Sequence, residues 1–301
     1  MFISADAIDE YCRMAESTAQ EALKRYCKAV LEVFGPDYLR LPTKTEIEKQ
    51  ITINKERGFP GMFGSLDCMS WAWKNCPKAW AGQFQGKDGH RNIVLEAVAD
   101  QSLRIWHAYF DLPGSNNDIN VVDRSPLVHN LLTGDLSAAN YEVNGREYNR
   151  LYLLTDGIYP NWSVFVKTIH EPQGEKRCHF AKMQEAVRKD VERCFGVLQA
   201  RFAIVSNPCR YWDQQQVKEI MLTCVVLHNM IVEDEQDDPT LNNEFLFEEV
   251  TLPEFRRDRT FGDLLTETTE IEDSRIHHQL RSDLIDHQRS PVNKRISECA
   301  A

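Results

Sequence analysis

The sequence predicts an α/β protein in which helices flank a central sheet. Two short apolar runs, residues 62–66 and 151–155, have the composition of buried strands, and an aspartate follows each of them. Residues 92–99 and 104–110 are two further apolar runs joined by a short turn, which is typical of paired strands. Residues 179–202 carry apolar side chains at helical spacing, which predicts an amphipathic helix packed on that sheet.

The composition is that of an ordinary globular protein. The chain has 301 residues, 42% hydrophobic and 27% charged, which is enough for one large domain with a small appended module. The start lacks the basic residues and apolar core of a signal peptide, and no apolar run reaches membrane-spanning length. We therefore expect no membrane association. The nine cysteines form no CxxC pair, which favours reduced thiols over a disulfide framework or a zinc site.

The net charge of −11 is unevenly spread along the chain. Residues 233–254 hold nine acidic side chains and no basic one, whereas residues 176–218 hold nine basic and four acidic ones. A basic face beside acidic residues would suit a phosphate backbone held over metal ions. A solvated helix face explains the same pattern equally well, so charge alone does not decide between the two.

The N-terminal part is predicted to be helical. Residues 4–35 form two helices, of which the second begins with a capping box at 18–21 and ends at Gly35-Pro36. The tight turn between them resembles the tail of a helix-turn-helix, although spacing alone favours a plain packing element. A second capping box, Thr43 with Glu46, predicts another helix that runs to about Arg57.

The middle of the chain is expected to form an antiparallel meander, which starts with the strand before Asp67. Residues 70–84, next along the chain, interleave aromatic side chains with Lys74 and Lys78. Such a segment can stack on bases or clamp a backbone, but we favour a packed aromatic cluster. Asp118 is placed to cap a helix that begins at Ile119. Residues 134–150 are polar and predicted to be a loop, and residues 165–168 an edge strand.

Acidic side chains mark the candidate site. Asp67 and Asp156 each follow a strand, and carboxylates at the ends of neighbouring strands converge outside the sheet edge, where α/β proteins bind ligands. Two anions this close repel each other, so the pair implies a divalent cation. Glu192 borders the buried stripe of helix 179–202. Alone it would be a surface salt-bridge partner, but beside the two aspartates it is a third candidate ligand.

The C-terminal third is predicted to contain two helices separated by an acidic linker or lid. Residues 214–231 form the first, in which His228 and Asn229 are a hydrogen-bonded core pair, and residues 262–287 form the second. We therefore expect three parts: a helical module at 1–57, a catalytic domain at 58–232, and the acidic linker with its amphipathic helix at 233–301.

Five stretches resemble the plant-type PIF/Harbinger DDE transposases, the Harbinger transposase-derived nuclease family. They are GFPGMFGSLDCM at 58–69, LPGSNNDIN at 112–120, DGIYP at 156–160, RKDVERCFGVLQARF at 188–202 and LHNMI at 227–231. The resemblance covers roughly residues 10–285, with the motifs in family order. It implies an RNase H-like mixed sheet, an antiparallel meander plus parallel strands flanked by helices, preceded by a helix-turn-helix-like module.

The same resemblance implies the chemistry. The catalytic and metal-binding triad of the family falls on Asp67, Asp156 and Glu192, which would hold two Mg²⁺ or Mn²⁺ ions for hydrolysis of DNA phosphodiester bonds. Strand transfer would follow if a 3′-OH replaced water. Hard oxygen ligands suit these ions and not zinc. The residues expected to bind nucleic acid are basic: Arg188, Lys189, Arg193, Lys182, Lys74 and Lys78.

The family also implies partners and a location. We expect DNA as substrate and a Myb-like protein that supplies sequence-specific binding and helps nuclear entry. The expected location is nuclear, or cytoplasmic without that partner, and a homo-oligomer is compatible with the sequence. Two other functions stay open. One is that of a domesticated transposase with a non-catalytic role in chromatin or transcription complexes. The other is that of a metal-dependent phosphohydrolase of small phosphoesters, a function that leaves the basic helix unexplained.

Overall fold

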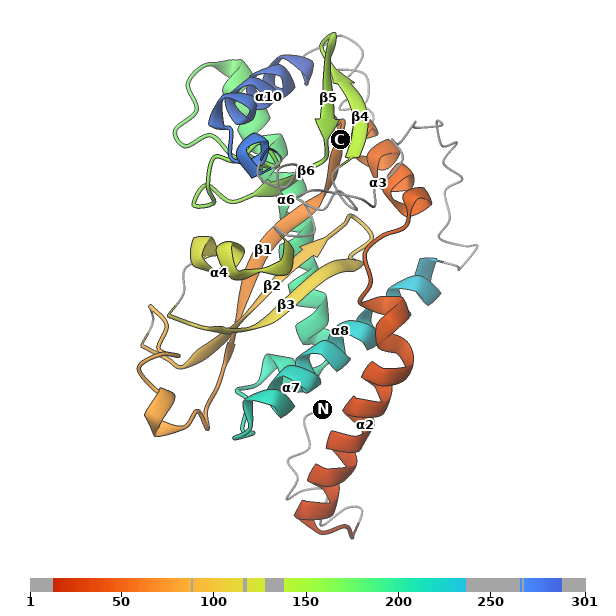
Figure 1. Cartoon of the computed structure of the whole chain (residues 1–301), viewed down its shortest axis with the longest axis vertical. Coiled ribbons are helices and arrows are strands. Elements are labelled where there is room, and N and C mark those ends of the chain that lie inside the picture. The colour runs from red at the N-terminus through yellow and green to blue at the C-terminus, as the bar shows by residue number, and fades with distance from the viewer. Residues whose placement is uncertain are drawn as a thin grey trace.

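The computed structural model describes residues 13–87, 89–115, 118–127, 138–236, 266 and 268–288, and its centre is a five-stranded sheet (Figure 1). The strand order is β3-β2-β1-β6-β7. The first three strands form an antiparallel meander, whereas β6 and β7 run parallel to β1. The predicted mixed sheet is therefore confirmed. Its strands are β1 (Met62–Ala72), β2 (Asn92–Ala99), β3 (Ile105–Pro113), β6 (Tyr152–Thr155) and β7 (Phe165–Lys167).

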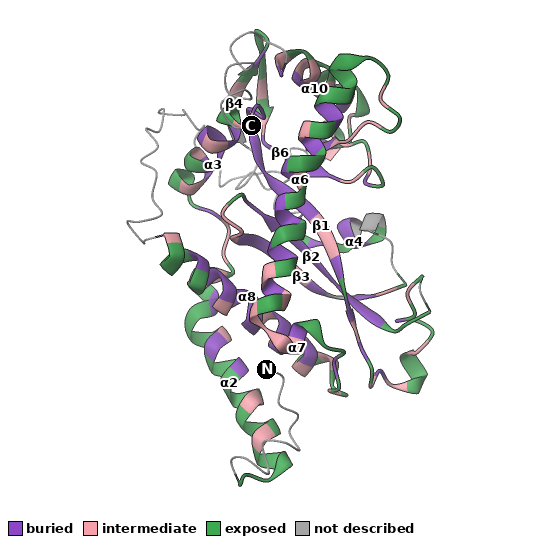
Figure 2. Ribbon diagram, turned by 180° about the vertical axis from the view of Figure 1, so that it is seen from behind, coloured by how far each residue is buried: buried purple, intermediate pink, exposed green. Residues whose placement is uncertain are grey.

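Helices lie on both faces of this sheet, and the long α6 crosses behind it in Figure 1 and in front of it in Figure 2. Apolar side chains of α6 and α8 pack on one face, and Val121 of α4 packs on the other. The helices are α2 (Glu16–Tyr38), α3 (Lys44–Glu56), α4 (Asp118–Arg124), α6 (Glu175–Arg201), α7 (Ala203–Ser206), α8 (Gln214–Gln236) and α10 (Ser274–His287), with a short 3₁₀ turn η1 (Lys78–Trp80).

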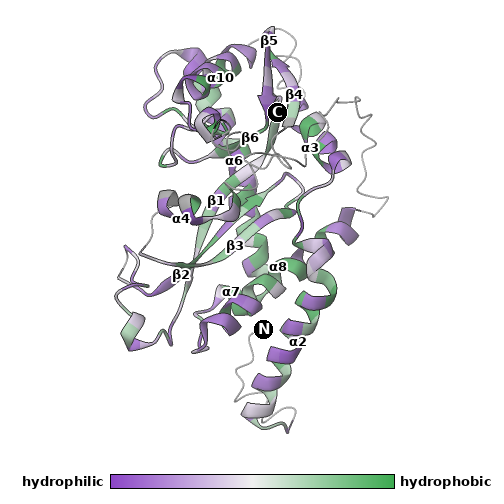
Figure 3. Cartoon of the chain, viewed as in Figure 1, coloured by the Kyte–Doolittle hydropathy of each residue, from purple (hydrophilic) through white to green (hydrophobic). Residues whose placement is uncertain are grey.

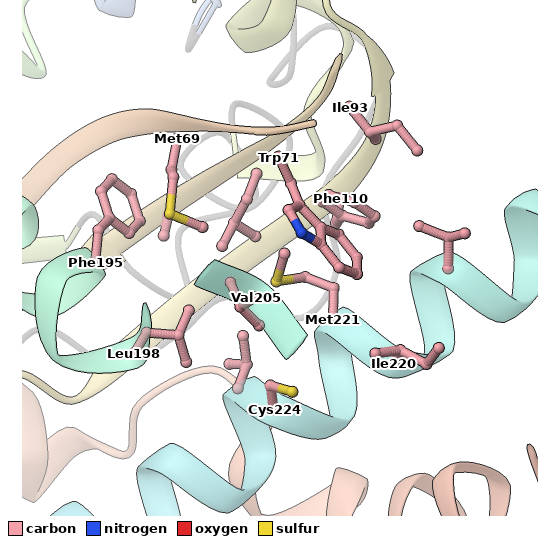
Figure 4. Close-up of a cluster of buried hydrophobic side chains, with 14 of the residues drawn as sticks. Met69, Trp71, Ile93, Phe110, Phe195, Leu198, Val205, Ile220, Met221 and Cys224 are labelled. Carbon is pink, nitrogen blue, oxygen red and sulfur yellow. The ribbon is translucent and has the colours of Figure 1, made fainter. Parts of the chain in front are cut away.

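The largest hydrophobic cluster fills the space between the meander and α6, α7 and α8. Trp71 and Phe110 from the sheet meet Leu198 of α6 and Met221 of α8 there (Figure 4). Side chains of α6 at helical spacing are buried along its length, as the sequence predicted. Figure 3 shows the same division, with the strands of the central sheet mostly apolar and α2 alternating between polar and apolar residues.

The strand predicted to end at Leu66 is longer, and that prediction was wrong. β1 continues to Ala72 because its antiparallel pairing with β2 continues, from Asp67 opposite Ala97 to Ala72 opposite Asn92. Beyond it, Trp73 is buried and donates from Nε1 to the carbonyl of Tyr211 at 2.7 Å. The aromatic segment is therefore mainly a packed cluster, as favoured, although Trp80 stays 41% exposed.

The prediction of a loop at residues 134–150 was also wrong for those of its residues that the structure describes. Residues 138–150 form a hairpin of β4 (Ala138–Val143) and β5 (Arg146–Arg150). Asn144 and Gly145 make its turn with φ values of 52° and 79°, the left-handed conformation that an Asn-Gly turn adopts. Residues 134–137 lie outside the described part of the chain.

The second N-terminal helix differs from the prediction at both ends: α2 begins at Glu16, so the capping box predicted at 18–21 lies inside the helix and that prediction was wrong. α2 does not end at Gly35-Pro36 but continues to Tyr38, whose carbonyl accepts a hydrogen bond of 3.0 Å from Nδ2 of Asn229. Packing along α8 thus outweighs the hydrogen bond that Pro36 cannot make. No side-chain cap precedes α2, whereas the predicted capping box before α3 is present. The predicted helix from Ser4 falls largely outside the described residues, and the helix-turn-helix stays a prediction.

The last two helices also have different bounds from those predicted. α8 reaches Gln236, and residues 237–265, which include most of the acidic stretch, lie outside the described chain. The single helix predicted at 262–287 is interrupted at Asp273, which caps α10 by accepting from the Arg275 amide. The His228 and Asn229 side chains are buried and hydrogen-bonded, to Leu103 and Ile105 respectively, as predicted. None of the described helices is long and apolar enough to cross a membrane.

Candidate active site

The sheet register brings Asp67 and Asp156 to the same level on neighbouring parallel strands. Ser65 of β1 pairs with Leu154 of β6, and each aspartate lies two residues beyond its member of that pair. β6 ends at Thr155. From the level of Asp67 onward, β1 therefore has no neighbouring strand on its β6 side within the described sheet. The two carboxylates therefore occupy one sheet edge, as the sequence analysis predicted, although Asp67 itself lies within a strand.

Helix α6 brings the third acidic residue to this edge. The Ser65 hydroxyl donates to the Val187 carbonyl at 3.3 Å and fixes the middle of α6 against β1. Side chains alternate along a strand, so Asp67 projects to the α6 side, as Ser65 does. Glu192 follows just over one turn after Val187 and is 42% exposed, whereas Asp67 is 19% exposed.

Arg188 joins two of the three carboxylates. Its Nη1 lies 2.8 Å from Oε1 of Glu192 and 3.3 Å from Oδ2 of Asp67. The Arg188 side chain is 14% exposed, and its Nε is buried without a hydrogen-bond partner. A guanidinium in this position reduces the repulsion between the two negative charges by contacting both carboxylates. The predicted nucleic-acid ligand Arg188 thus lies inside the carboxylate site.

A second cation lies beside Asp156. Lys167 pairs in register with Thr155, the residue before Asp156, and donates from Nζ to Asn161 at 3.0 Å. Burial lowers the pKa of Lys167, as does the nearby Arg281 of α10, whereas the Asp156 charge raises it. The carboxylate of Asp156 also accepts a hydrogen bond of 2.6 Å from the Gly157 amide. This end of the site therefore has positive charge next to its carboxylate as well.

The three carboxylates fit a divalent cation in chemistry but not in their present spacing. Their hard oxygens are the ligands that Mg²⁺ and Mn²⁺ prefer, and Arg188 shows that a cation is accommodated between Asp67 and Glu192. In the described part of the chain, however, no three His, Cys, Asp or Glu side chains are grouped so that they could hold a metal ion. A metal would therefore require Arg188 to move away.

The other predicted nucleic-acid ligands lie in three places. Lys182 and Lys189 are exposed on α6. Arg193 pairs at 2.5 Å with the buried Asp190, and Arg57 of the loop after α3 binds the same carboxylate at 2.7 Å. Arg193 thus shares one buried carboxylate with Arg57, and its side chain remains 60% exposed. The remaining two, Lys74 and Lys78, are exposed beyond the far end of β1.

Sequence reasoning missed two features of this site. Arg188 was assigned to DNA, although its position four residues before Glu192 is the spacing of a helical ion pair and signals the contact. Lys167 was treated only as part of an edge strand. Its place beside Asp156 depends on the parallel register of β6 and β7, which no local pattern encodes.

Comparison with known proteins identifies relatives of the chain. A family described as "Plant transposon protein" matches residues 36–239. A protein named "Protein ALP1-like" from Arabidopsis thaliana is 24% identical over 245 residues, which cover 80% of this chain and 59% of that protein. Proteins named "Putative nuclease HARBI1" from Bos taurus and Homo sapiens are 24% and 23% identical over 182 residues, 60% of this chain and 48% of theirs.

The chain spans between 48% and 59% of the length of these relatives. No solved structure gave a significant match. The family match covers residues 36–239, which include Asp67, Asp156 and Glu192 and more than half of the chain. The chain therefore belongs to the plant transposon protein family, among the Harbinger transposase-derived proteins.

Proposed function

We propose that this protein is a divalent-metal-dependent endonuclease that hydrolyses DNA phosphodiester bonds with Asp67, Asp156 and Glu192. One observation carries the proposal: two aspartates lie level on adjacent parallel strands, and Glu192 shares a cation with the first of them. The strand order, a meander followed by two parallel strands, supports an RNase H-like fold for this domain. The names of the relatives support a nuclease.

Asp67, Asp156 and Glu192 would hold two Mg²⁺ or Mn²⁺ ions. Bound in this way, the ions would supply Lewis acidity for in-line attack on a phosphodiester and stabilise the leaving oxygen. Asp67 lies on β1, Glu192 lies on α6, and Asp156 directly follows β6. These elements therefore fix the positions of the three carboxylates that would bind the ions. Replacing any one of them by its amide removes a negative ligand with little change in shape.

Arg188 and Lys167 supply the fixed positive charge of the site. In the present arrangement, Arg188 offsets one of the two negative charges of Asp67 and Glu192 and holds the two carboxylates near each other. Once displaced, its guanidinium would still be tethered one helical turn from Glu192, where it can donate to a phosphate oxygen. Lys167 would likewise hold a phosphate near Asp156, since its ammonium group lies at the same sheet edge.

The exposed lysines extend this surface toward DNA. Lys182 and Lys189 lie on α6, and Lys74 and Lys78 beyond β1, where they would contact the phosphate backbone. By the same family resemblance, we propose a nuclear location and a Myb-like partner for sequence-specific binding. The helix-turn-helix-like module at 1–57, the catalytic domain at 58–232, the tail at 233–301 and a homo-oligomeric state belong to this proposal too.

A second candidate function is a non-catalytic role in chromatin or transcription complexes. The arrangement of Arg188 favours it, because a salt bridge that satisfies Asp67 and Glu192 gives them a structural purpose without metal. The two functions differ in one property: only the nuclease needs the carboxylates to accept a divalent ion.

Nicking of supercoiled plasmid tests the nuclease directly. We expect purified protein with Mg²⁺ or Mn²⁺ to nick DNA, and Asp156→Asn to fold normally but lose nicking. Asp234→Asn on α8 is the matched control, because this exposed aspartate lies outside the site. Chelation with EDTA should stop the wild type. Equal nicking by wild type and Asp156→Asn would overturn the assignment of the triad.

A further inference from the structure

A basic groove lies beyond the end of β1, at the opposite end of that strand from its pairing with β6. It is an open hollow of about 480 Å³, and three of its lining residues, Lys74, His90 and Arg91, carry basic side chains. Trp73 and Pro208 form part of its wall. This hollow is separate from the carboxylate site and contains none of its residues.

Three chain segments are joined to build the groove. Trp73 forms a parallel bridge with Cys209, and both side chains are buried, so the next residues, Lys74 and Arg210, project outward. The Trp73 amide donates to the carbonyl of Arg91 at 2.6 Å, which attaches the third segment. The basic residues are therefore carried on a hydrogen-bonded frame and not on independent loops.

Two of the cations that line the groove, Lys74 and Arg91, are exposed, and so is Arg210, which follows the bridged Cys209. None of these three forms an ion pair within the described residues. Trp212, two residues after Arg210 in the chain, is 66% exposed, the largest exposed fraction of any large apolar side chain described. Exposed cations and an exposed aromatic ring on the same chain segments are features that nucleic-acid-binding surfaces use.

The groove is connected to the candidate active site by two elements. β1 leads from Asp67 to Lys74, and α6 follows it, because Gln199 donates to the sulfur of Met69 at 3.3 Å. Farther along, Trp71 donates to the Asn207 carbonyl at 2.8 Å. Both elements therefore point from the carboxylates toward the groove. Lys74 is seven residues beyond Asp67, or roughly 23 Å along an extended strand.

We propose that this groove binds the phosphate backbone of the duplex that flanks the cleavage position. The inference rests on the proposed nuclease function and extends it by a second DNA contact. A separation of roughly 23 Å corresponds to about 7 base pairs of B-form DNA. The substrate is therefore a duplex that reaches at least that far from the carboxylates, and a shorter one engages only one of the two surfaces.

Binding of a fluorescently labelled duplex in EDTA tests the groove without any contribution from cleavage. We compare wild type with Lys74→Glu and Arg91→Glu on a duplex of about 20 base pairs, over a series of salt concentrations. Each substitution should weaken binding about tenfold and reduce the salt slope by about 1. Lys24→Glu on α2 is the control, since it makes the same charge change on an exposed lysine outside the groove.

A hairpin-closed duplex of about 6 base pairs separates the two surfaces, because it is too short to span them. On it, wild type should bind more weakly than on the duplex of about 20 base pairs, because only one of the two surfaces is engaged at a time. The groove proposal is wrong if Lys24→Glu weakens binding to the long duplex as much as Lys74→Glu, or if both groove variants bind like wild type. If wild type binds no DNA, the proposed nuclease function fails as well. Circular dichroism confirms that each variant is folded.

Discussion

Arg188 lies 3.3 Å from Asp67, and through this contact the protein carries its own cation inside a site built of carboxylates. The same nitrogen reaches Glu192 at 2.8 Å, so one side chain compensates two acidic residues on different elements. A divalent ion and the guanidinium compete for the same oxygens. Arg188 is therefore expected to lower the metal affinity of the site and to stabilise the fold when no metal is bound.

Replacing Arg188 by glutamine tests this competition. Without the guanidinium, Asp67 and Glu192 repel each other, and the metal-free protein should lose about 1–3 kcal/mol of unfolding free energy. Mn²⁺ should then raise the melting temperature of Arg188→Gln by more than it raises that of wild type, because tighter binding to the folded state stabilises it more. Thermal unfolding with and without Mn²⁺ measures both effects.

Arg25→Gln is the control for that experiment, because Arg25 makes an exposed ion pair with Glu21 on α2. Its melting temperature should respond to Mn²⁺ as wild type does. An equal response of Arg188→Gln and wild type would show that Arg188 does not compete with metal.

His277 should make stability depend on pH. Burial lowers its pKa from 6.5 to about 4, and its Nδ1 lies 2.7 Å from the Phe165 carbonyl, to which it donates when neutral. Between these two pKa values the unfolded chain binds a proton that the folded chain does not. The unfolding free energy should therefore fall by up to about 3 kcal/mol as the pH drops from about 6.5 to 4, with the full contribution present above 6.5.

Urea unfolding of wild type and His277→Asn at pH 7 and pH 5 measures this term. Asparagine keeps a donor for the carbonyl but does not titrate, so its stability should change less between the two pH values. The same pH dependence in both proteins would assign the effect to other groups.

Gly61 is required by its surroundings at the start of β1. It has φ of +81°, and a Cβ there would lie 2.3 Å from the ring of Tyr141 on β4. Gly61→Ala should therefore cost about 2–4 kcal/mol of unfolding free energy, since both the backbone and the Tyr141 contact must change. Gly82→Ala is the matched control, because no atom lies within 4 Å of the Cβ that it would add. Denaturant unfolding compares the two, and equal losses would contradict this explanation.

Much of the sheet could be predicted from the sequence because its strands are apolar on both faces. β2 was predicted with its exact bounds, since all its residues are buried and turn residues flank it. The β4–β5 hairpin was missed because β5 exposes most of its residues and lacks an apolar pattern. Its Asn144-Gly145 pair was the available signal.

The remaining differences depend on contacts distant in sequence. α2 continues past Pro36 because it packs along α8, and β1 continues past Asp67 because β2 still pairs with it. The three acidic residues of the site were named from sequence motifs, but the salt bridge of Arg188 to Asp67 joins residues 121 positions apart. Such a contact follows only from the packing of α6 on β1.

The most direct test of the central claim is calorimetric titration of the metal-free protein with Mn²⁺. The proposed site predicts binding to wild type and to Asp234→Asn, and loss of that binding in Asp156→Asn. Such a result would hold even if nicking also required a partner protein. Equal binding by wild type and Asp156→Asn, or no binding by wild type, would contradict a metal site at these carboxylates and favour the non-catalytic function.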